Sequence, residues 1–386
     1  RNSMKLRKAA VASVIFMGVA GMTTDADAQS GNSVVSNVAS ASVTTPKLQR
    51  TIKLGGLLSE SIEIMKISFS PNGRYLGIVG SGHSSPTIIV VWDMQRDREQ
   101  SRIHCQYDYS TTEEDHLLWS SDGKTLSFGP KMQWDAMTGD TLPERPAVGF
   151  SARLNKDGSK LLTLVGTLGD PSDIYVYDTK TWALQIIHAD GLRVTTASWT
   201  TDDRILVSAM PTSETGEGKT LDGHLIHWYD TAIRLVDPSG KEKTKAVWFP
   251  QEPTNDPKSP YTYAFPVGTE GQTNFATNEI FLASGQIING ATLSVRHYHS
   301  FNATDIAPGG SGMGFSPDGK FLYLKGSTFA DPGRKPIENS IVDIASGKPL
   351  LQFSGAMGDG EGLAVSPDGQ YLALANKSSV LLFNLR

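Results

Sequence analysis

One short stretch recurs in this chain and limits what it can fold into. Phe315–Leu324 has the sequence FSPDGKFLYL, the stretch Val365–Leu374 repeats it as VSPDGQYLAL, and Phe69–Ile78 is a third copy, FSPNGRYLGI. Proline presets φ, Asp or Asn bonds its own backbone, and glycine accepts a positive φ, so each copy predicts a tight turn between two strands. Apolar and polar residues alternate on both sides, as in half-buried strands. Such a unit has to stack against copies of itself.

The repeats continue along the chain in weaker form. Each unit is expected to hold a strand, the turn, a second strand, a third strand that ends in Asp or Asn, and a fourth strand. The expected turn cores are 71–73, 121–123, 156–158, 201–203, 317–319 and 367–369, and the third strands are expected to end at Asp93, Asp135, Asp178, Asp237, Asp343 and Asn384.

The gap between the turns at 203 and 319 is roughly twice the usual spacing, which predicts a degenerate unit between them. Its second strand is expected at Glu279–Ser284, its third at Gln286–Asn289 and its fourth at Leu293–Phe301. Residues 268–278 are expected to be a loop insertion. This brings the count to about seven units.

The two ends of the repeat array complement each other. The last unit stops at Arg386 after its third strand, while Leu48–Leu54 is an alternating strand with no neighbouring hairpin partner. Joining them closes a ring and removes open sheet edges. The sequence therefore predicts an all-β, seven-bladed β-propeller of four-stranded antiparallel blades over residues 46–386.

From Leu48 to Arg386 the chain resembles the WD-repeat-like β-propellers, and most closely the bacterial secreted type built on S-P-D-G turns. The W-D dipeptide itself occurs at Trp92-Asp93 and Trp134-Asp135. The G-H dipeptide of that family is missing before the first strand, so the full structural tetrad of the eukaryotic repeats is not expected. The resemblance implies the fold and leaves the function open.

The N-terminus has the organisation of an export signal. Met4 opens a basic segment, Ala9–Met22 is apolar, and Ala26-Asp27-Ala28 offers a cleavage site. The apolar run is short for a membrane span. We expect a signal peptide at 1–28 (1–3 being an artefact ahead of Met4), a flexible leader at 29–45, and a periplasmic or secreted protein; a retained signal is the alternative.

Composition excludes several classes of function. The formal net charge is −5 and no basic block follows the signal, so no electrostatic footprint for nucleic acid is present. The single cysteine, Cys105, excludes an internal disulfide and cysteine-rich zinc modules. The chain has no G-x-S-x-G elbow and no P-loop.

The long connections are expected on one face of the ring. They fall between second and third strands or between blades, for example at Pro211–Thr231, His104–His116 and Pro250–Tyr261. Both kinds of connection emerge at the same end of a four-stranded antiparallel blade. Loops on a rigid scaffold commonly carry function, so we expect the binding face there.

The richest loop holds Asp222, His224, His227, Trp228 and Tyr229. His224 and His227 would lie together on a helical turn, with Asp222 as a third ligand, and they are the weak candidates for a metal site. The H-E-x-x-H pattern is absent. The alternative is a solvated loop packed down by its two aromatic residues.

The remaining candidate residues lie between blades. Asp108, Asp115 and His116 belong to an acidic patch that would hold a cation or only aid solubility, and Tyr261 ends another inter-blade loop. No cofactor is expected beyond this weakly indicated metal ion.

Two functions remain open from the sequence. The first is a non-catalytic binding or scaffold protein that presents the loop face to a protein or peptide partner. The second is a periplasmic enzyme or enzyme subunit, lactonase-like or dehydrogenase-associated, with a metal or polar cluster at the mouth of the pore. That second function rests on the resemblance of fold alone.

Overall fold

The computed structural model describes most of the repeat array. Described are residues 46–54, 62–82, 85–105, 117–129, 131–146, 149–165, 173–188, 192–211, 216–219, 225–228, 231–239, 242–249, 271–282, 286–297, 313–325, 339–353 and 362–386. They belong to one compact unit, Val43–Arg386. The expected signal peptide and leader lie outside these residues. Among the described residues, no helix is long and apolar enough to cross a membrane.

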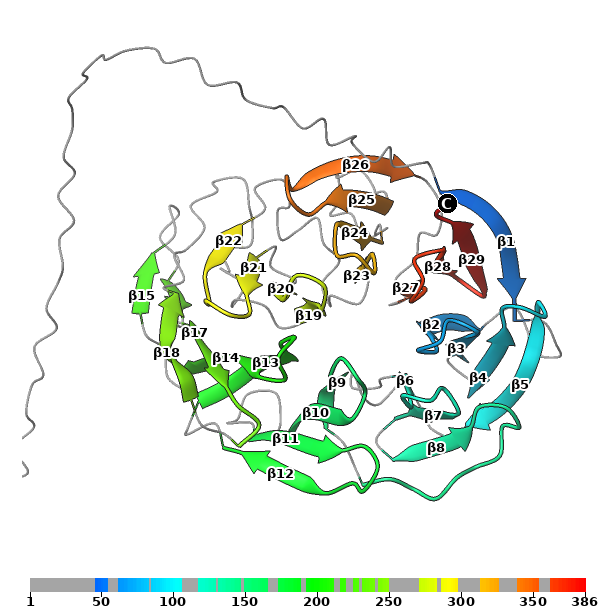
Figure 1. The fold of residues 1–386 in the computed structure, drawn as a ribbon, viewed down its shortest axis with the longest axis horizontal. Helices are drawn as coiled ribbons and strands as arrows, with labels where there is room; N and C mark the ends of the chain where they lie inside the picture. The colour runs from blue at the N-terminus through cyan, green and yellow to red at the C-terminus, as the bar shows by residue number, and fades with distance from the viewer. Residues whose placement is uncertain are drawn as a thin grey trace, which may run out of the picture. The chain divides into compact units, whose positions relative to one another are not determined.

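The described strands form seven antiparallel blades around a ring, as the sequence predicts (Figure 1). The first three blades are β2 (Glu63–Phe69), β3 (Tyr75–Gly82), β4 (Ser85–Asp93) and β5 (Arg98–Cys105); β6 (Leu118–Trp119), β7 (Thr125–Phe128) and β8 (Met132–Asp135); and β9 (Phe150–Leu154), β10 (Lys160–Val165), β11 (Asp173–Asp178) and β12 (Leu184–Ile187).

The fourth to sixth blades complete most of the ring. They are β13 (Leu192–Trp199), β14 (Ile205–Pro211), β17 (Thr231–Val236) and β18 (Glu242–Phe249); β19 (Gly271–Asn274), β20 (Glu279–Leu282), β21 (Gln286–Asn289) and β22 (Val295–His297); and β23 (Met313–Phe315), β24 (Phe321–Leu324), β25 (Asn339–Asp343) and β26 (Lys348–Phe353). A separate hairpin of β15 (Gly216–Lys219) and β16 (Leu225–Trp228) is inserted between β14 and β17.

The seventh blade joins the two ends of the array. It contains β27 (Leu363–Val365), β28 (Tyr371–Asn376), β29 (Ser379–Asn384) and β1 (Lys47–Lys53). β1 runs antiparallel to β29, from the pair Lys47 and Asn384 to the pair Lys53 and Ser379. The prediction that the N-terminal strand completes the C-terminal blade is confirmed.

The S-P-D-G turns hold themselves together by side-chain hydrogen bonds. In the sixth blade the Ser316 hydroxyl accepts the N–H of Phe321 at 2.9 Å and donates to the Asp318 carboxylate at 2.6 Å. The backbone N–H of Gly319 donates to the Ser316 carbonyl. The turns at Ser70, Ser120 and Ser366 repeat the serine contacts, with Asn72 in the carboxylate's place in the first. The recurrent sequence thus predicts a recurrent network.

Each turn also contacts the turn of the next blade. Gly319 shows why glycine is needed: its φ is +70°, and a Cβ there would lie 2.7 Å from Cβ of Ala276 in the preceding blade. The seven contacts around the ring are Gly73 to Pro367, Gly123 to Ser70, Gly158 to Ser121, Asp203 to Asn155, Asn278 to Thr201, Gly319 to Ala276 and Gly369 to Pro317. The turns therefore form a closed circle.

The hydrophobic core lies between blades. The cluster that joins the last blade to the first contains Ile52, Leu382 and Ala373 from one and Ile64 and Ile78 from the other, all nearly inaccessible to solvent. A further cluster joins the third and fourth blades through Leu162, Ile174 and Trp199. Because each blade buries its faces against its neighbours, the blades depend on one another for stability.

Two details differ from the sequence prediction. In the degenerate fifth blade, Gly271–Asn274 forms the first strand and 275–278 its turn, so the loop expected at 268–278 is wrong over these residues. Asn278 takes the positive φ, +56°, that glycine takes in most other turns.

The second blade has three strands, and its fourth is reduced to an isolated bridge between Trp134 and Thr141 because Pro143 and Pro146 interrupt the segment.

Ring closure predicts a contrast between two residues of β1. Ile52 is 2% exposed in the closing cluster, whereas Leu48 is 53% exposed. Ile52→Ala should lower the free energy of unfolding by about 2–5 kcal/mol through lost burial and a cavity, and Leu48→Ala by less than about 0.5 kcal/mol. Urea unfolding measures both; equal effects would contradict closure by β1.

Candidate functional site

The antiparallel pairing gives each blade two ends, and each end holds a different set of connections. Turns between first and second strands and between third and fourth strands lie at one end of each blade, here called the turn face. Connections between second and third strands and between blades lie at the other end, the loop face. This assignment follows from the pairing alone, since antiparallel strands reverse direction at each connection.

On the turn face, the ends of the third strands repeat one carboxylate or amide cap. Asp135 Oδ1 accepts the backbone N–H groups of Met137 and Thr138, and Asp178 and Asn289 accept the corresponding pairs in their blades. Asp343 accepts the N–H of Ser346 in the same way. These residues are the strand endings that the sequence predicts.

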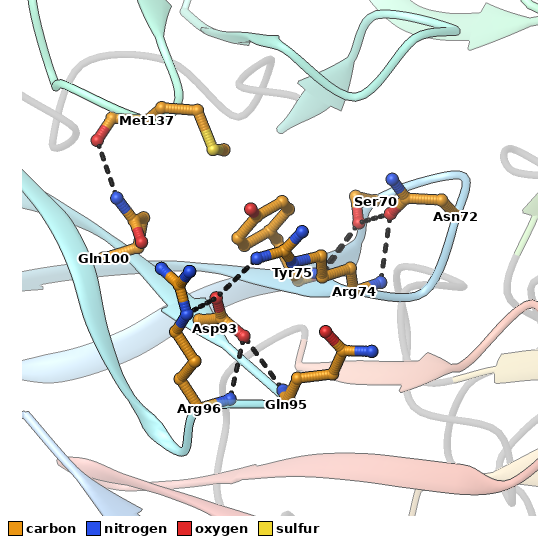
Figure 2. A network of polar contacts seen from close by, with 9 residues as sticks. All are labelled: Ser70, Asn72, Arg74, Tyr75, Asp93, Gln95, Arg96, Gln100 and Met137. Atoms are coloured by element: carbon orange, nitrogen blue, oxygen red, sulfur yellow. Dashed lines mark hydrogen bonds and ion pairs between the residues drawn. The ribbon is translucent and has the colours of Figure 1, made fainter.

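Asp93 is the most buried of these caps, with a fully buried side chain (Figure 2). Its Oδ1 accepts the N–H groups of Gln95 and Arg96 at 2.9 and 3.0 Å, and its Oδ2 lies 3.3 Å from an Arg74 guanidinium nitrogen. Burial alone would raise the pKa of Asp93, but these hydrogen bonds and the Arg74 charge outweigh it and lower that pKa. The carboxylate stays ionised and its lone pairs are engaged, which suits a structural cap.

The outer strand of the first blade is tied to the second blade beside this network. Gln100 donates to the Met137 carbonyl at 3.1 Å, which Figure 2 shows, and Ser101 donates to the Ala136 carbonyl at 2.7 Å. The guanidinium of Arg74 also lies 5.1 Å from the ring centre of Tyr75. The Asp93 carboxylate and the Gln100 and Ser101 side chains therefore bond within the protein, whereas Arg74 Nε is buried without a hydrogen-bond partner.

The turn carboxylates share a lowered pKa. Burial alone would raise the pKa of Asp318 and of Asp368, but hydrogen bonds from the Ser316 and Ser366 hydroxyls and from backbone N–H groups outweigh it. In Asp122 the Ser120 hydroxyl is the largest cause of the lowered pKa. A general acid needs a pKa near the working pH, so the lowered pKa does not suit these side chains to that role.

The predicted site residues lie mostly outside the described residues. These are Asp108, Asp115, His116, Asp222, His224, Tyr229 and Tyr261. His227 and Trp228 are in β16, whose backbone pairs with β15 so that His227 is opposite Glu217 and Trp228 is opposite Gly216. Their place between the second and third strands of the fourth blade is on the loop face, as expected.

Residues 225–228 are a strand, so the helical turn expected to bring His227 beside His224 does not form over this segment. Among the described residues, no group of three or more His, Cys, Asp or Glu side chains is arranged to hold a metal ion. The two weak metal candidates remain predictions, because His224 is not described.

One charged residue was missed by the sequence analysis. Arg145 is 3% exposed, and one of its terminal nitrogens donates to the Gly129 carbonyl at 2.8 Å. Its Nε and its Nη1 are buried without a hydrogen-bond partner. Burial lowers the pKa of Arg145 to about 10, with the Tyr177 phenol opposing. A Pro-Glu-Arg-Pro segment is typical of an exposed loop, so the sequence carries no signal of this burial.

Comparisons with known proteins assign no family. No protein-family model matches the chain, and a search of curated proteins finds no match.

The lowered pKa values predict how stability depends on pH. A carboxylate with a pKa below its usual 3.8 stabilises the folded state above pH 4, and this contribution is lost as the pH falls through the folded-state pKa. The double variant Asp318→Asn, Asp368→Asn should lose stability less steeply between pH 5 and about 3, because two of these groups no longer titrate.

The first blade supplies the reason that this variant should fold. Asn72 occupies the same turn position and accepts the same hydrogen bonds, from the Ser70 hydroxyl at 2.8 Å and the Arg74 N–H at 3.0 Å. Urea midpoints across the pH range test the prediction. An acid slope identical to that of the unsubstituted protein would contradict a stabilising role for the ionised turn carboxylates.

Proposed function

We propose that this chain is an exported, non-catalytic binding or scaffold protein of the WD-repeat-like propeller type, which presents its loop face to a protein or peptide partner. The observation that carries the proposal is the contrast between the two faces. On the turn face, the side chains of the recurrent turns bond one another and the backbone. On the loop face, the fourth blade carries an inserted hairpin, β15–β16.

The physical basis of the proposal is that the turn face is rigid, whereas the loop face accepts an insertion without loss of the blade. A turn whose hydroxyl, carboxylate and N–H groups already pair internally offers few groups to a ligand. An insertion between strands does not interrupt the blade, since β14 still pairs with β17 from Ile205 and Val236 to Ala209 and Ala232. Loops of this kind on a rigid scaffold are where binding residues are commonly found.

The fourth-blade insertion is the segment to remove in a test. Replacing residues 212–230 by Gly-Asn-Gly between β14 and β17 shortens the loop face and keeps the blade. Tagged protein is recovered from the periplasm and culture fluid of the producing cell, and bound proteins are measured by quantitative mass spectrometry. We expect the bound partner to fall at least tenfold with no change in the thermal midpoint.

A matched control substitutes exposed residues of the turn face, Lys156→Ala with Lys180→Ala. Partner recovery should stay unchanged in this control. Loss of the partner in the control but not in the loop replacement would overturn the proposal, and turnover of a small molecule that depends on residues 212–230 would favour the enzymatic alternative.

A further inference from the structure

The outer strand of the third blade, β12, lacks the protection that the other described outer strands carry. Edge strands are commonly guarded by charges or proline. Such residues occur in β5 (Arg98, Glu99, Arg102), the second-blade segment (Pro143, Glu144), β18 (Glu242, Lys243, Lys245), β22 (Arg296), β26 (Lys348, Pro349) and β1 (Lys47, Arg50, Lys53). β12 reads Leu-Gln-Ile-Ile, and Leu184 and Ile186 are 45% and 41% exposed.

The backbone N–H and C=O groups of β12 also point outward at Leu184 and Ile186. The Ala183 carbonyl accepts the N–H of Asp178 on the inner side. In an antiparallel ladder such inward residues alternate with outward ones, so Leu184 and Ile186 direct their N–H and C=O groups away from β11. Exposed apolar side chains and outward backbone groups thus coincide.

An aromatic group lies beside the start of this edge. Tyr177 is opposite Leu184 on β11, and its ring lies 6.1 Å from that of Trp182 and 6.3 Å from that of Tyr175. The guanidinium carbon of Arg145 lies 5.9 Å from the Trp182 ring centre. The buried cation with two unpaired nitrogens is therefore adjacent to the exposed edge.

Trp182 occupies a position where glycine is favoured. Its φ is +57°, and its N–H donates to the carbonyl four residues earlier, as Gly139 and Gly347 do in the equivalent turns. A bulky residue in this left-handed region is strained. In this conformation the half-buried indole lies over Arg145.

We propose that β12 binds an extended peptide segment that adds a further antiparallel strand to the third blade and places a carboxylate against Arg145. The occupant is a partner segment with apolar residues at alternate positions, bound by the outward backbone groups of Leu184 and Ile186 and by their side chains. This surface is on the outer rim and does not depend on the loop-face proposal.

The antiparallel direction sets where the carboxylate lies. The carboxyl end of a strand paired antiparallel to β12 lies beside the beginning of β12, next to Trp182. Arginine pairs with carboxylate through two parallel hydrogen bonds along one edge of the guanidinium. The unpaired Nε and Nη1 of Arg145 are on different edges, so the carboxylate pairs with one of them and with the N–H of Nη2 that does not bond Gly129. Because the guanidinium is covered, the Trp182 indole has to shift as the carboxylate enters. An acidic side chain and a C-terminal carboxylate share this chemistry.

Three labelled peptides of alternating valine and threonine distinguish the two carboxylate sources. One ends in a free carboxylate, one in an amide, and one in aspartate followed by an amide. Fluorescence anisotropy with the full chain measures their affinity. We expect at least one of the two carboxylate-bearing peptides to bind tenfold or more tightly than the plain amide, and the preferred one identifies the source.

Variants of β12 and of Arg145 test strand addition and carboxylate binding separately. Leu184→Lys with Ile186→Lys should abolish binding of all three peptides, while Leu350→Lys on the outer strand β26, a matched exposed leucine, should leave it unchanged. Arg145→Met should remove the preference for the carboxylate and retain weak binding. Arg145→Lys is a second variant that keeps the charge, with circular dichroism melting as the check on folding.

Three results would overturn the proposal. The first is no binding of any peptide at millimolar concentration, and the second is equal affinity for carboxylate and amide. The third is a concentration-dependent dimer that Leu184→Lys with Ile186→Lys dissociates, which would assign the edge to a second copy of this chain.

Discussion

The contact between the turns of neighbouring blades is the constraint on which the rest of the structure depends. Each turn is rigid because a serine, threonine or asparagine side chain caps it from within. Neighbouring turns are in contact around the ring, most closely at Gly319 and Gly369, where a Cβ would lie 2.7 and 3.0 Å from the neighbouring turn. Seven such contacts return to the starting point only if the first and last blades meet. The strand β1 completes the last blade, and its Ile52 fills the core between the last blade and the first.

This circle occupies the polar groups of the turn face. The turn face uses its hydroxyls, carboxylates and N–H groups on itself, and the lowered pKa values of Asp93, Asp318 and Asp368 are a consequence of that pairing. Insertions on the opposite face leave the circle intact, as the β15–β16 hairpin shows. On the outer rim, charged residues or proline protect the edge strands, and β12 has neither.

Repetition made most of the fold predictable. The S-P-D-G copies identify strand order and turn type because the same capping chemistry recurs at each turn, and the unpartnered strand at Leu48–Leu54 identifies ring closure. The turn at Asn274–Asn278 was missed since it has neither proline nor glycine; asparagine supplies both the cap and the positive φ. Arg145 was missed for another reason. Its burial arises from the packing of two blades, and no local pattern in Pro143–Pro146 encodes that packing. The candidate residues of the loop face, such as His224 and Tyr261, have no repeat to fix their place.

Closure by β1 is tested most directly by a cross-link between the two ends of the chain. Thr51 and Leu381 are directly opposite in the pair of β1 and β29, and the one native cysteine, Cys105, is buried and far along the chain. The double variant Thr51→Cys, Leu381→Cys should form an intramolecular disulfide on mild oxidation and resist urea better than its reduced form. The neighbouring pair Thr51→Cys, Leu382→Cys should not, because successive side chains of a strand point to opposite faces. Disulfides formed only between molecules, or formed equally by both pairs, would contradict a ring closed by its N-terminal strand.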